Sequence, residues 1–239
     1  MEQFEPIHFE HDGVALKGFF AAPEGNGPFP TVMVMHSALG LHHQVAEKVR
    51  MLADLGYLAV ATDMYGADAN TSNPEAAGQY FMDLVQNTAK LRARTAGWRD
   101  AIAARSDCDE SRIGAIGYCF GGKCVLELAR SGADVKAVSS FHGVLSTDMP
   151  AQPGIVRAIT AAYCGTTDPY APIADIDALR SELSAAGANF QIMEFGGVAH
   201  GFTDPSAAEL GQDGVRYDSR ADRVSWAGTL ALLEAELRG

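Results

Sequence analysis

The stretch Arg112-Ile113-Gly114-Ala115-Ile116-Gly117-Tyr118-Cys119-Phe120-Gly121 decides the fold. In it an apolar run passes through a glycine-flanked cysteine into a helical pattern that continues to Arg130. A strand that turns this sharply into a helix lifts the central side chain above the sheet edge, and the glycines allow the turn. Cys119 would then lie at a helix N-terminus, where free N–H groups favour a thiolate. The segment predicts a nucleophile elbow, although these residues alone fit a buried, inert cysteine equally well.

Length and charge set the class of protein. The chain has 239 residues, which fits one large α/β domain spanning residues 1–239. It carries 18 basic and 30 acidic residues, a net charge of −12. This charge repels nucleic acid and anionic membranes, so we expect neither as a partner.

The N-terminal and cysteine patterns predict a cytoplasmic protein. Residues Met1–Glu5 are acidic and lack the apolar core of a signal peptide, and no apolar run approaches the ~20 residues that span a bilayer. The four cysteines are Cys108, Cys119, Cys124 and Cys164, and none forms a C-x-x-C pair. Their spread suits a reducing compartment.

Apolar strand-like runs alternate with helical patterns along the chain. This alternation predicts an α/β fold with a mostly parallel, twisted sheet and helices on both faces. We expect a hairpin over residues 8–20, turning at Asp12-Gly13, and strands over 31–36, 58–62, 112–117, 135–141, 159–164 and 189–194. Expected helices cover 45–55, 74–105 with a break near Gly97, 120–130, 173–186 and 219–237.

A nucleophile needs a base, and the base needs an acid that orients it. In doubly wound hydrolases these partners follow the elbow in the order acid, then histidine, each on a loop after a later strand. Asp168 follows the strand 159–164, and His200 follows the strand 189–194. Taken alone, Asp168 fits a helix N-cap and His200 a solvated loop histidine. Their order after Cys119 predicts a Cys119–His200–Asp168 triad.

An oxyanion hole requires two backbone N–H groups aimed at the developing negative oxygen. One is expected from Phe120, directly after the nucleophile. The second is expected from Ala38, in the loop Ser37-Ala38-Leu39-Gly40 after the strand 31–36. His36 and His142 end strands at the same sheet edge, so we expect both to line the substrate pocket.

These motifs resemble the dienelactone hydrolase family, the cysteine-nucleophile branch of the α/β-hydrolase fold. The resemblance covers nearly the whole chain and rests on Gly117–Gly122, Gly165-Thr166-Thr167-Asp168, Ala199-His200-Gly201-Phe202 and Gly56–Tyr65. It implies hydrolysis of lactones or esters through an acyl-cysteine, with the same triad and without a cofactor or metal. Further expected pocket residues are Ser37, Tyr118, Phe202 and Asp204.

Two departures from the family pattern concern charge. The family's glutamate before the second oxyanion donor is Ser37 here, so no carboxylate there controls the thiol. The family places an arginine four residues after the histidine, and this chain has Asp204 at that position, whose carboxylate would repel an anionic lactone. Another arginine, Arg92, Arg94 or Arg99, could bind a substrate carboxylate instead. A neutral ester, thioester or lactone is the expected substrate.

Three alternatives stay open. The same cysteine could act mainly on neutral phosphotriesters or on aryl esters with good leaving groups. His36, His42, His43 and His142 could hold a metal, although no H-x-H or H-x-x-x-H spacing supports this. The chain could also be a binding module with an inactive elbow. Neither the physiological substrate nor the oligomeric state follows from the sequence.

Overall fold

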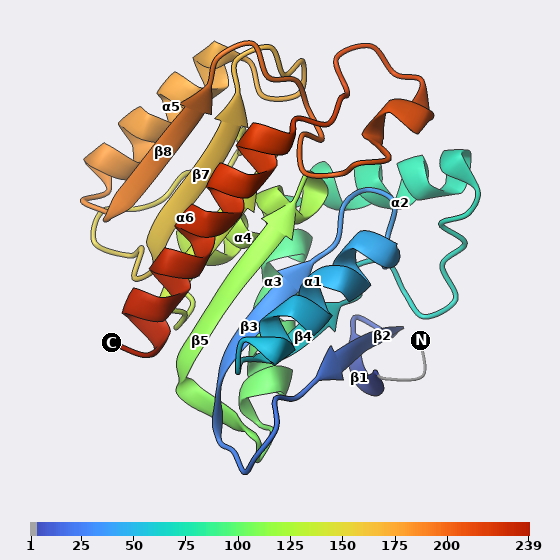
Figure 1. Ribbon diagram of the computed structural model, residues 1–239, viewed down its shortest axis with the longest axis vertical. Coiled ribbons are helices and arrows are strands. Elements are labelled where there is room, and N and C mark those ends of the chain that lie inside the picture. Colours follow the sequence, from blue (N-terminus) through green and yellow to red (C-terminus); the bar gives the residue numbers. More distant parts are fainter. Residues whose placement is uncertain (1–3) are drawn as a thin grey trace.

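The computed structural model describes residues 4–239 and is built around one eight-stranded sheet (Figure 1). Its strand order is β1-β2-β4-β3-β5-β6-β7-β8. The strands are β1 (Glu5–His11), β2 (Val14–Ala21), β3 (Phe29–Met35), β4 (Leu58–Thr62), β5 (Cys108–Tyr118), β6 (Ala137–Phe141), β7 (Ile159–Gly165) and β8 (Phe190–Phe195). The pairs β1–β2 and β2–β4 are antiparallel, and every other pair is parallel. The predicted mostly parallel sheet is confirmed.

Helices cover both faces of the sheet. In Figure 1, α1 (His43–Asp54) and α6 (Ser219–Leu237) lie in front of it, with α3 (Thr88–Ala103) and α4 (Phe120–Arg130) behind. The remaining helices are α2 (Pro74–Val85), α5 (Ile173–Ala185) and the 3₁₀ helix η1 (Ala207–Leu210). Within residues 4–239, no helix combines the length and the apolarity needed to cross a membrane.

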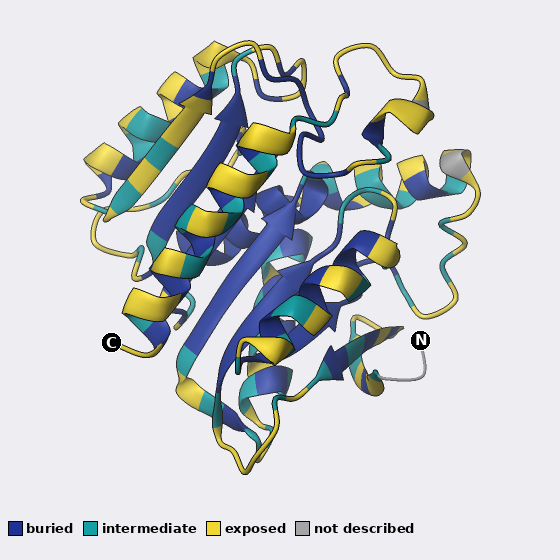
Figure 2. Ribbon diagram, in the orientation of Figure 1, coloured by how far each residue is buried: buried dark blue, intermediate teal, exposed yellow. Residues whose placement is uncertain are grey.

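The central strands are buried on both faces, which explains their continuous apolar sequence. Along β3, Val32 and Val34 pack in the cluster that contains the buried side chains of α1 and α6. Met33 and Met35 point the other way, into the cluster with α3 and α4. Figure 2 shows the result, with dark blue central strands between helices whose outward faces are exposed. The period of two along each strand therefore divides the core into two layers.

The predicted helix break near Gly97 is wrong. The break lies at Gln86–Asn87, where the Asn87 side chain begins α3 by accepting a hydrogen bond from the Lys90 N–H at 3.0 Å. Gly97 lies inside α3, and a Cβ there would stand 2.4 Å from the Phe9 ring. This glycine therefore makes room for a packed aromatic side chain rather than ending a helix.

The sheet brings the predicted site residues to one edge. Five parallel strands, β3, β5, β6, β7 and β8, end at this edge. In the same order, the residues that follow these strand ends within a few positions are Ser37, Cys119, His142, Asp168 and His200. Parallel strands end at the same edge, which is where open α/β sheets place their ligands.

Candidate active site

The turn from β5 to α4 holds Cys119 in a strained conformation. Its backbone has φ 55° and ψ −112°, a region that residues with a side chain rarely adopt. A Cβ on Gly117 would lie 2.0 Å from the Gly121 carbonyl oxygen, and a Cβ on Gly121 would lie 2.2 Å from the Met35 carbonyl oxygen. Only glycine fits at both positions, so the chain turns tightly enough to set Cys119 against the end of β3.

Asp168 and His200 meet beside this turn. The Asp168 Oδ2 atom lies 2.8 Å from His200 Nδ1, and both side chains are buried. The other Asp168 oxygen accepts the Tyr170 N–H at 2.8 Å, which fixes the carboxylate plane. The backbone N–H of His200 donates to the Gly214 carbonyl at 2.8 Å, which anchors the loop that carries the histidine. This geometry suits an acid that orients a histidine base.

The half-buried Cys119 sulfur completes the arrangement. It lines one cavity together with His200 and Ala38, and the His200 side chain and the backbone N–H groups of Ala38 and Phe120 are the groups that stabilise its anion. The structure therefore brings together all five residues that the sequence nominated for the triad and the oxyanion hole.

The electrostatics of the pair favour a charge-separated state. Burial raises the pKa of the Cys119 thiol, but contacts with His200, Ala38 and Phe120 outweigh it, so the pKa lies below the ordinary value. Burial lowers the pKa of His200, while Asp168 and the Cys119 sulfur raise it to about 10. These two directions favour a thiolate beside an imidazolium over the neutral pair.

A cavity of about 270 Å³ opens onto the sulfur. Its lining includes the predicted residues Ser37, Ala38, Cys119, His142, His200 and Asp204. The remaining lining is mostly apolar: Leu39, Gln44, Phe81, Val144, Tyr170, Gly201, Ala207, Gln212 and Val215. A larger open groove of about 800 Å³, between the β1–β2 hairpin and α1, contains none of the triad. The smaller cavity is the candidate substrate site.

Three residues that the sequence assigned to the pocket do not line this cavity. Tyr118 is buried on the α1 and α6 side, where its ring stacks on Phe141 with centroids 4.7 Å apart. Phe202 is fully buried behind His142, with ring centroids 5.0 Å apart. His36 is also fully buried, and both of its ring nitrogens are used within the protein. A position at the correct sheet edge did not reveal which way each side chain points.

His142 does line the cavity, as a neutral ring. Its Nε2 atom lies 2.8 Å from the Thr203 hydroxyl, which accepts a hydrogen bond from the Gln44 amide at 3.0 Å. Burial, together with the charge on His200, holds the pKa of His142 well below its usual range. His142 therefore adds shape and a polar contact to the site without a second positive charge.

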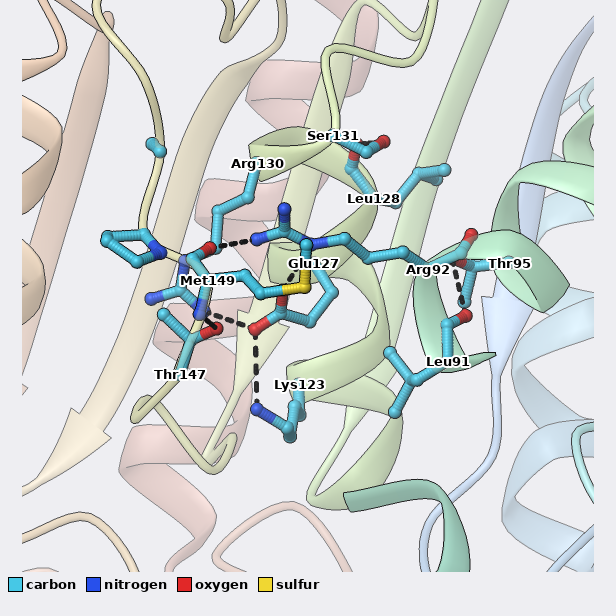
Figure 3. A network of polar contacts seen from close by, with 12 residues as sticks. Leu91, Arg92, Thr95, Lys123, Glu127, Leu128, Arg130, Ser131, Thr147 and Met149 are labelled. Atoms are coloured by element: carbon cyan, nitrogen blue, oxygen red, sulfur yellow. Dashed lines mark hydrogen bonds and ion pairs between the residues drawn. The ribbon is translucent and has the colours of Figure 1, made fainter. Parts of the chain in front are cut away.

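The first arginine considered as a clamp is held in an ion-pair network away from the cavity. Arg92 Nε pairs with Glu127 at 2.7 Å, and its Nη2 donates to the Met149 carbonyl. Lys123 and Arg130 bind the same buried Glu127, at 3.3 and 2.9 Å (Figure 3). This network ties α3 and α4 to the loop after β6, and Arg92 does not line the cavity.

The other two arginines are also placed elsewhere. Arg94 is buried and donates to the Met64 carbonyl at 2.7 Å. Arg99 pairs with Asp100 at 3.2 Å and Asp134 at 3.8 Å. Among the residues that the structure describes, no lysine or arginine lines the cavity.

The four histidines considered for a metal are not arranged as one site. His36 and His142 are tied up as described, and His42 Nε2 lies 3.1 Å from the Ser37 hydroxyl. Over residues 4–239, no group of three or more His, Cys, Asp or Glu side chains is placed to hold a metal ion.

Sequence reasoning missed several lining residues. Tyr170 lies two positions after Asp168, and its ring packs edge-on to His200 with centroids 4.8 Å apart. Its closeness to the acid in the sequence was a usable signal. Phe81 comes from the exposed-looking helix α2, and Gln212 and Val215 come from the loop after η1. No motif marks these three residues.

Comparisons with known proteins identify the family of this chain. The model of the "Dienelactone hydrolase family" matches residues 16–237. A relative from Methylorubrum extorquens that carries the name carboxymethylenebutenolidase is 31% identical over 219 residues, covering 85% of this chain and 74% of the relative. The crystal structure of a dienelactone hydrolase-like promiscuous phosphotriesterase from metagenomic libraries superposes with a TM-score of 0.92, at 32% identity and 98% coverage of both chains.

A more distant structure shows that the fold itself is shared. The dienelactone hydrolase of Anabaena variabilis aligns with a TM-score of 0.70 at 18% identity, covering 99% of this chain and 100% of that one. With the family match over most of its length, the chain belongs to the dienelactone hydrolase family and is a hydrolase of ester or lactone bonds.

Proposed function

We propose that this chain hydrolyses carboxylic esters or lactones through an acyl-cysteine intermediate formed on Cys119. The observation that carries the proposal is the buried Asp168–His200 hydrogen bond, 2.8 Å long, with His200 and the Cys119 sulfur lining the same cavity. The His200 side chain and the backbone N–H groups of Ala38 and Phe120 lower the pKa of that sulfur.

Acylation begins from the thiolate–imidazolium pair. The Cys119 sulfur attacks the carbonyl carbon, a C–S bond forms, and the carbonyl electron pair moves onto oxygen. The N–H groups of Ala38 and Phe120 stabilise that oxyanion. The C–O bond to the leaving group then breaks, and His200 gives its proton to the departing oxygen.

Deacylation uses the same histidine as a base. Neutral His200 takes a proton from water, which attacks the thioester carbonyl and forms a second oxyanion in the same hole. The C–S bond breaks, the acid product leaves, and the thiolate again faces an imidazolium. Asp168 keeps the Nε2 side of His200 directed at the sulfur by holding Nδ1.

Ser37 places a neutral hydroxyl where a glutamate would put a carboxylate beside the thiolate. Its hydroxyl contacts His42 and accepts the Leu39 N–H at 3.3 Å, so this position carries no charge. A glutamate there would repel the thiolate or compete for the histidine proton. The serine therefore supports a nucleophile that is ionised before substrate binds.

The charge of the cavity supports a preference for neutral substrates. Asp204 lines it, and burial lowers the pKa of the nearby His42 to about 4, so His42 is uncharged at neutral pH. The Asp204 carboxylate is therefore not offset by this histidine, and no lysine or arginine among the described residues faces it there. A substrate carboxylate would meet a like charge in a partly desolvated site.

Neutral phosphotriesters are the second candidate substrates. The structure at TM-score 0.92 and 32% identity belongs to a protein named as a promiscuous phosphotriesterase. In such a reaction the sulfur forms an S–P bond, the aryl oxide leaves, and the two N–H groups hold the phosphoryl oxygen. Water activated by His200 then breaks the S–P bond, releasing the phosphodiester and restoring the thiolate.

We expect Cys119 to ionise below the ~8.5 of a free cysteine, because the imidazolium and two N–H groups stabilise its anion. Since only the thiolate reacts, iodoacetamide alkylation plotted against pH should show an inflection clearly below that value. Ser37→Glu should raise the inflection, and Ser37→Gln serves as its uncharged control. An inflection at or above the free-cysteine value in the wild type would contradict the resting ion pair.

Cys119→Ala should lower turnover of p-nitrophenyl esters and lactones by roughly a thousandfold or more, because the covalent intermediate can no longer form. A neutral aryl phosphotriester in the same assay tests the second candidate and should lose turnover equally. Cys108→Ala, at the opposite end of β5, is the matched control and should stay active. A wild type that turns over no member of the panel would contradict the proposed substrates, and a Cys119→Ala variant that keeps its rate would show that another group is the nucleophile.

Asp204→Arg should shift selectivity toward anionic substrates. We expect wild-type kcat/KM to be higher for a neutral aryl ester than for its analogue with a carboxylate on the acyl side. The substitution should narrow this ratio by at least about tenfold, or about 1.4 kcal/mol. Glu24→Arg makes the same change in net charge at an exposed position outside the cavity and should leave the ratio unchanged. A wild-type enzyme that prefers the anionic ester would contradict the proposed selectivity.

A further inference from the structure

His36 is a fully buried histidine that the proposed reaction does not use directly. It follows β3 and stands immediately before the loop that carries Ala38. Its Nδ1 atom lies 2.6 Å from the Ser37 carbonyl oxygen, and its Nε2 atom lies 3.0 Å from the Met64 backbone nitrogen. Both ring nitrogens are therefore bonded to backbone groups of two different loops.

These partners fix the tautomer of the ring. The Met64 N–H is a donor, so Nε2 must accept and carries no proton. Burial lowers the pKa of His36, which keeps the ring neutral near pH 7 with one N–H. That N–H is on Nδ1, and it donates to the Ser37 carbonyl.

The Ser37 carbonyl belongs to the peptide unit that also contains the Ala38 N–H. A trans peptide is planar, so its C=O and N–H point in opposite directions. The Ser37–Ala38 peptide bond is not cis. When His36 holds the carbonyl oxygen on its own side, the Ala38 N–H must point to the other side, where the Cys119 sulfur lies.

Other contacts brace the same turn. The Gly40 N–H also donates to the Ser37 carbonyl, at 3.1 Å, and the Tyr65 hydroxyl donates to the Ala38 carbonyl at 3.2 Å. The His36 ring packs against both Tyr65 and Phe120, with centroids 4.7 and 5.8 Å away, and these two rings stack on each other. His36 thus touches the residue that provides the other oxyanion donor, and it cannot rotate without disturbing this packing.

We propose that His36 is the positioning residue of the oxyanion hole: its Nδ1–H holds the Ser37–Ala38 peptide so that the Ala38 N–H stays directed at the developing oxyanion. A hydrogen bond to the carbonyl also polarises the peptide and strengthens its N–H as a donor. This inference rests on the proposed function. The competing explanation is that His36 only ties β3 to the loop after β4 through Met64.

Two amide substitutions separate these roles, because each reproduces one half of the imidazole. The side-chain nitrogen of His36→Asn can take the place of Nδ1 and donate to Ser37. The side-chain oxygen of His36→Gln can take the place of Nε2 and accept from Met64. Turnover of a neutral p-nitrophenyl ester is measured per Cys119 thiol, counted by iodoacetamide on the Cys119 peptide in protein whose buried Cys108, Cys124 and Cys164 stay unmodified.

We expect His36→Gln to lower kcat by roughly ten- to a hundredfold with little change in KM, since a misdirected oxyanion donor acts on the transition state. His36→Asn should stay within about threefold of the wild type. Alkylation at a pH where the thiol is fully ionised should be equal in all three proteins, because displacement of iodide develops no oxyanion.

Equal losses of kcat in both variants, or a wild-type kcat in His36→Gln, would overturn the proposal. If His36→Gln yields no folded protein, His36→Asn is compared with His36→Ala instead. The proposal then requires the kcat per thiol of His36→Asn to be at least about tenfold higher than that of His36→Ala. Failure of the proposed function would be recognised separately, since Cys119→Ala would then keep its turnover.

Discussion

The close approach of the elbow to the end of β3 is the constraint on which the site depends. With no side chain at Gly121, the first turn of α4 rests against the Met35 carbonyl, where a Cβ would be only 2.2 Å from oxygen. This contact puts Phe120 and Cys119 beside the loop that begins at His36. Two backbone donors from separate elements therefore converge on one sulfur, and a displaced helix would separate them.

The proposed mechanism requires an acidic chain to maintain a reactive thiolate. The protein carries a net charge of −12, and in this proposal the group that stabilises the sulfur is the imidazolium of His200, held by buried Asp168. The surrounding histidines His36, His42 and His142 are kept neutral by burial. The cation that acts on the nucleophile is thus local, and the rest of the cavity stays free of lysine and arginine among the described residues.

The sequence allowed much of this to be predicted, for reasons that are local. Apolar runs, the glycines around Cys119 and the order of Asp168 and His200 follow rules of backbone geometry and strand direction. Side-chain direction and long-range packing are not encoded in such patterns. The error at Gly97 arose because Phe9, distant in sequence, occupies the space beside it. Likewise, His36 turned inward to bond two backbone groups, and Arg92 paired with Glu127 rather than facing a substrate.

In the proposed mechanism an acyl group passes through Cys119 while His200 activates water. In the test, the His200→Ala variant is mixed with a p-nitrophenyl ester at a pH high enough to ionise the Cys119 thiol although the histidine is missing. The protein is then analysed by intact-mass and peptide mass spectrometry. One equivalent of p-nitrophenolate should appear, and a single acyl group should accumulate on the peptide that contains Cys119, because water needs the missing base. A steady state equal to the wild type, or an acyl group on any other residue, would contradict the account.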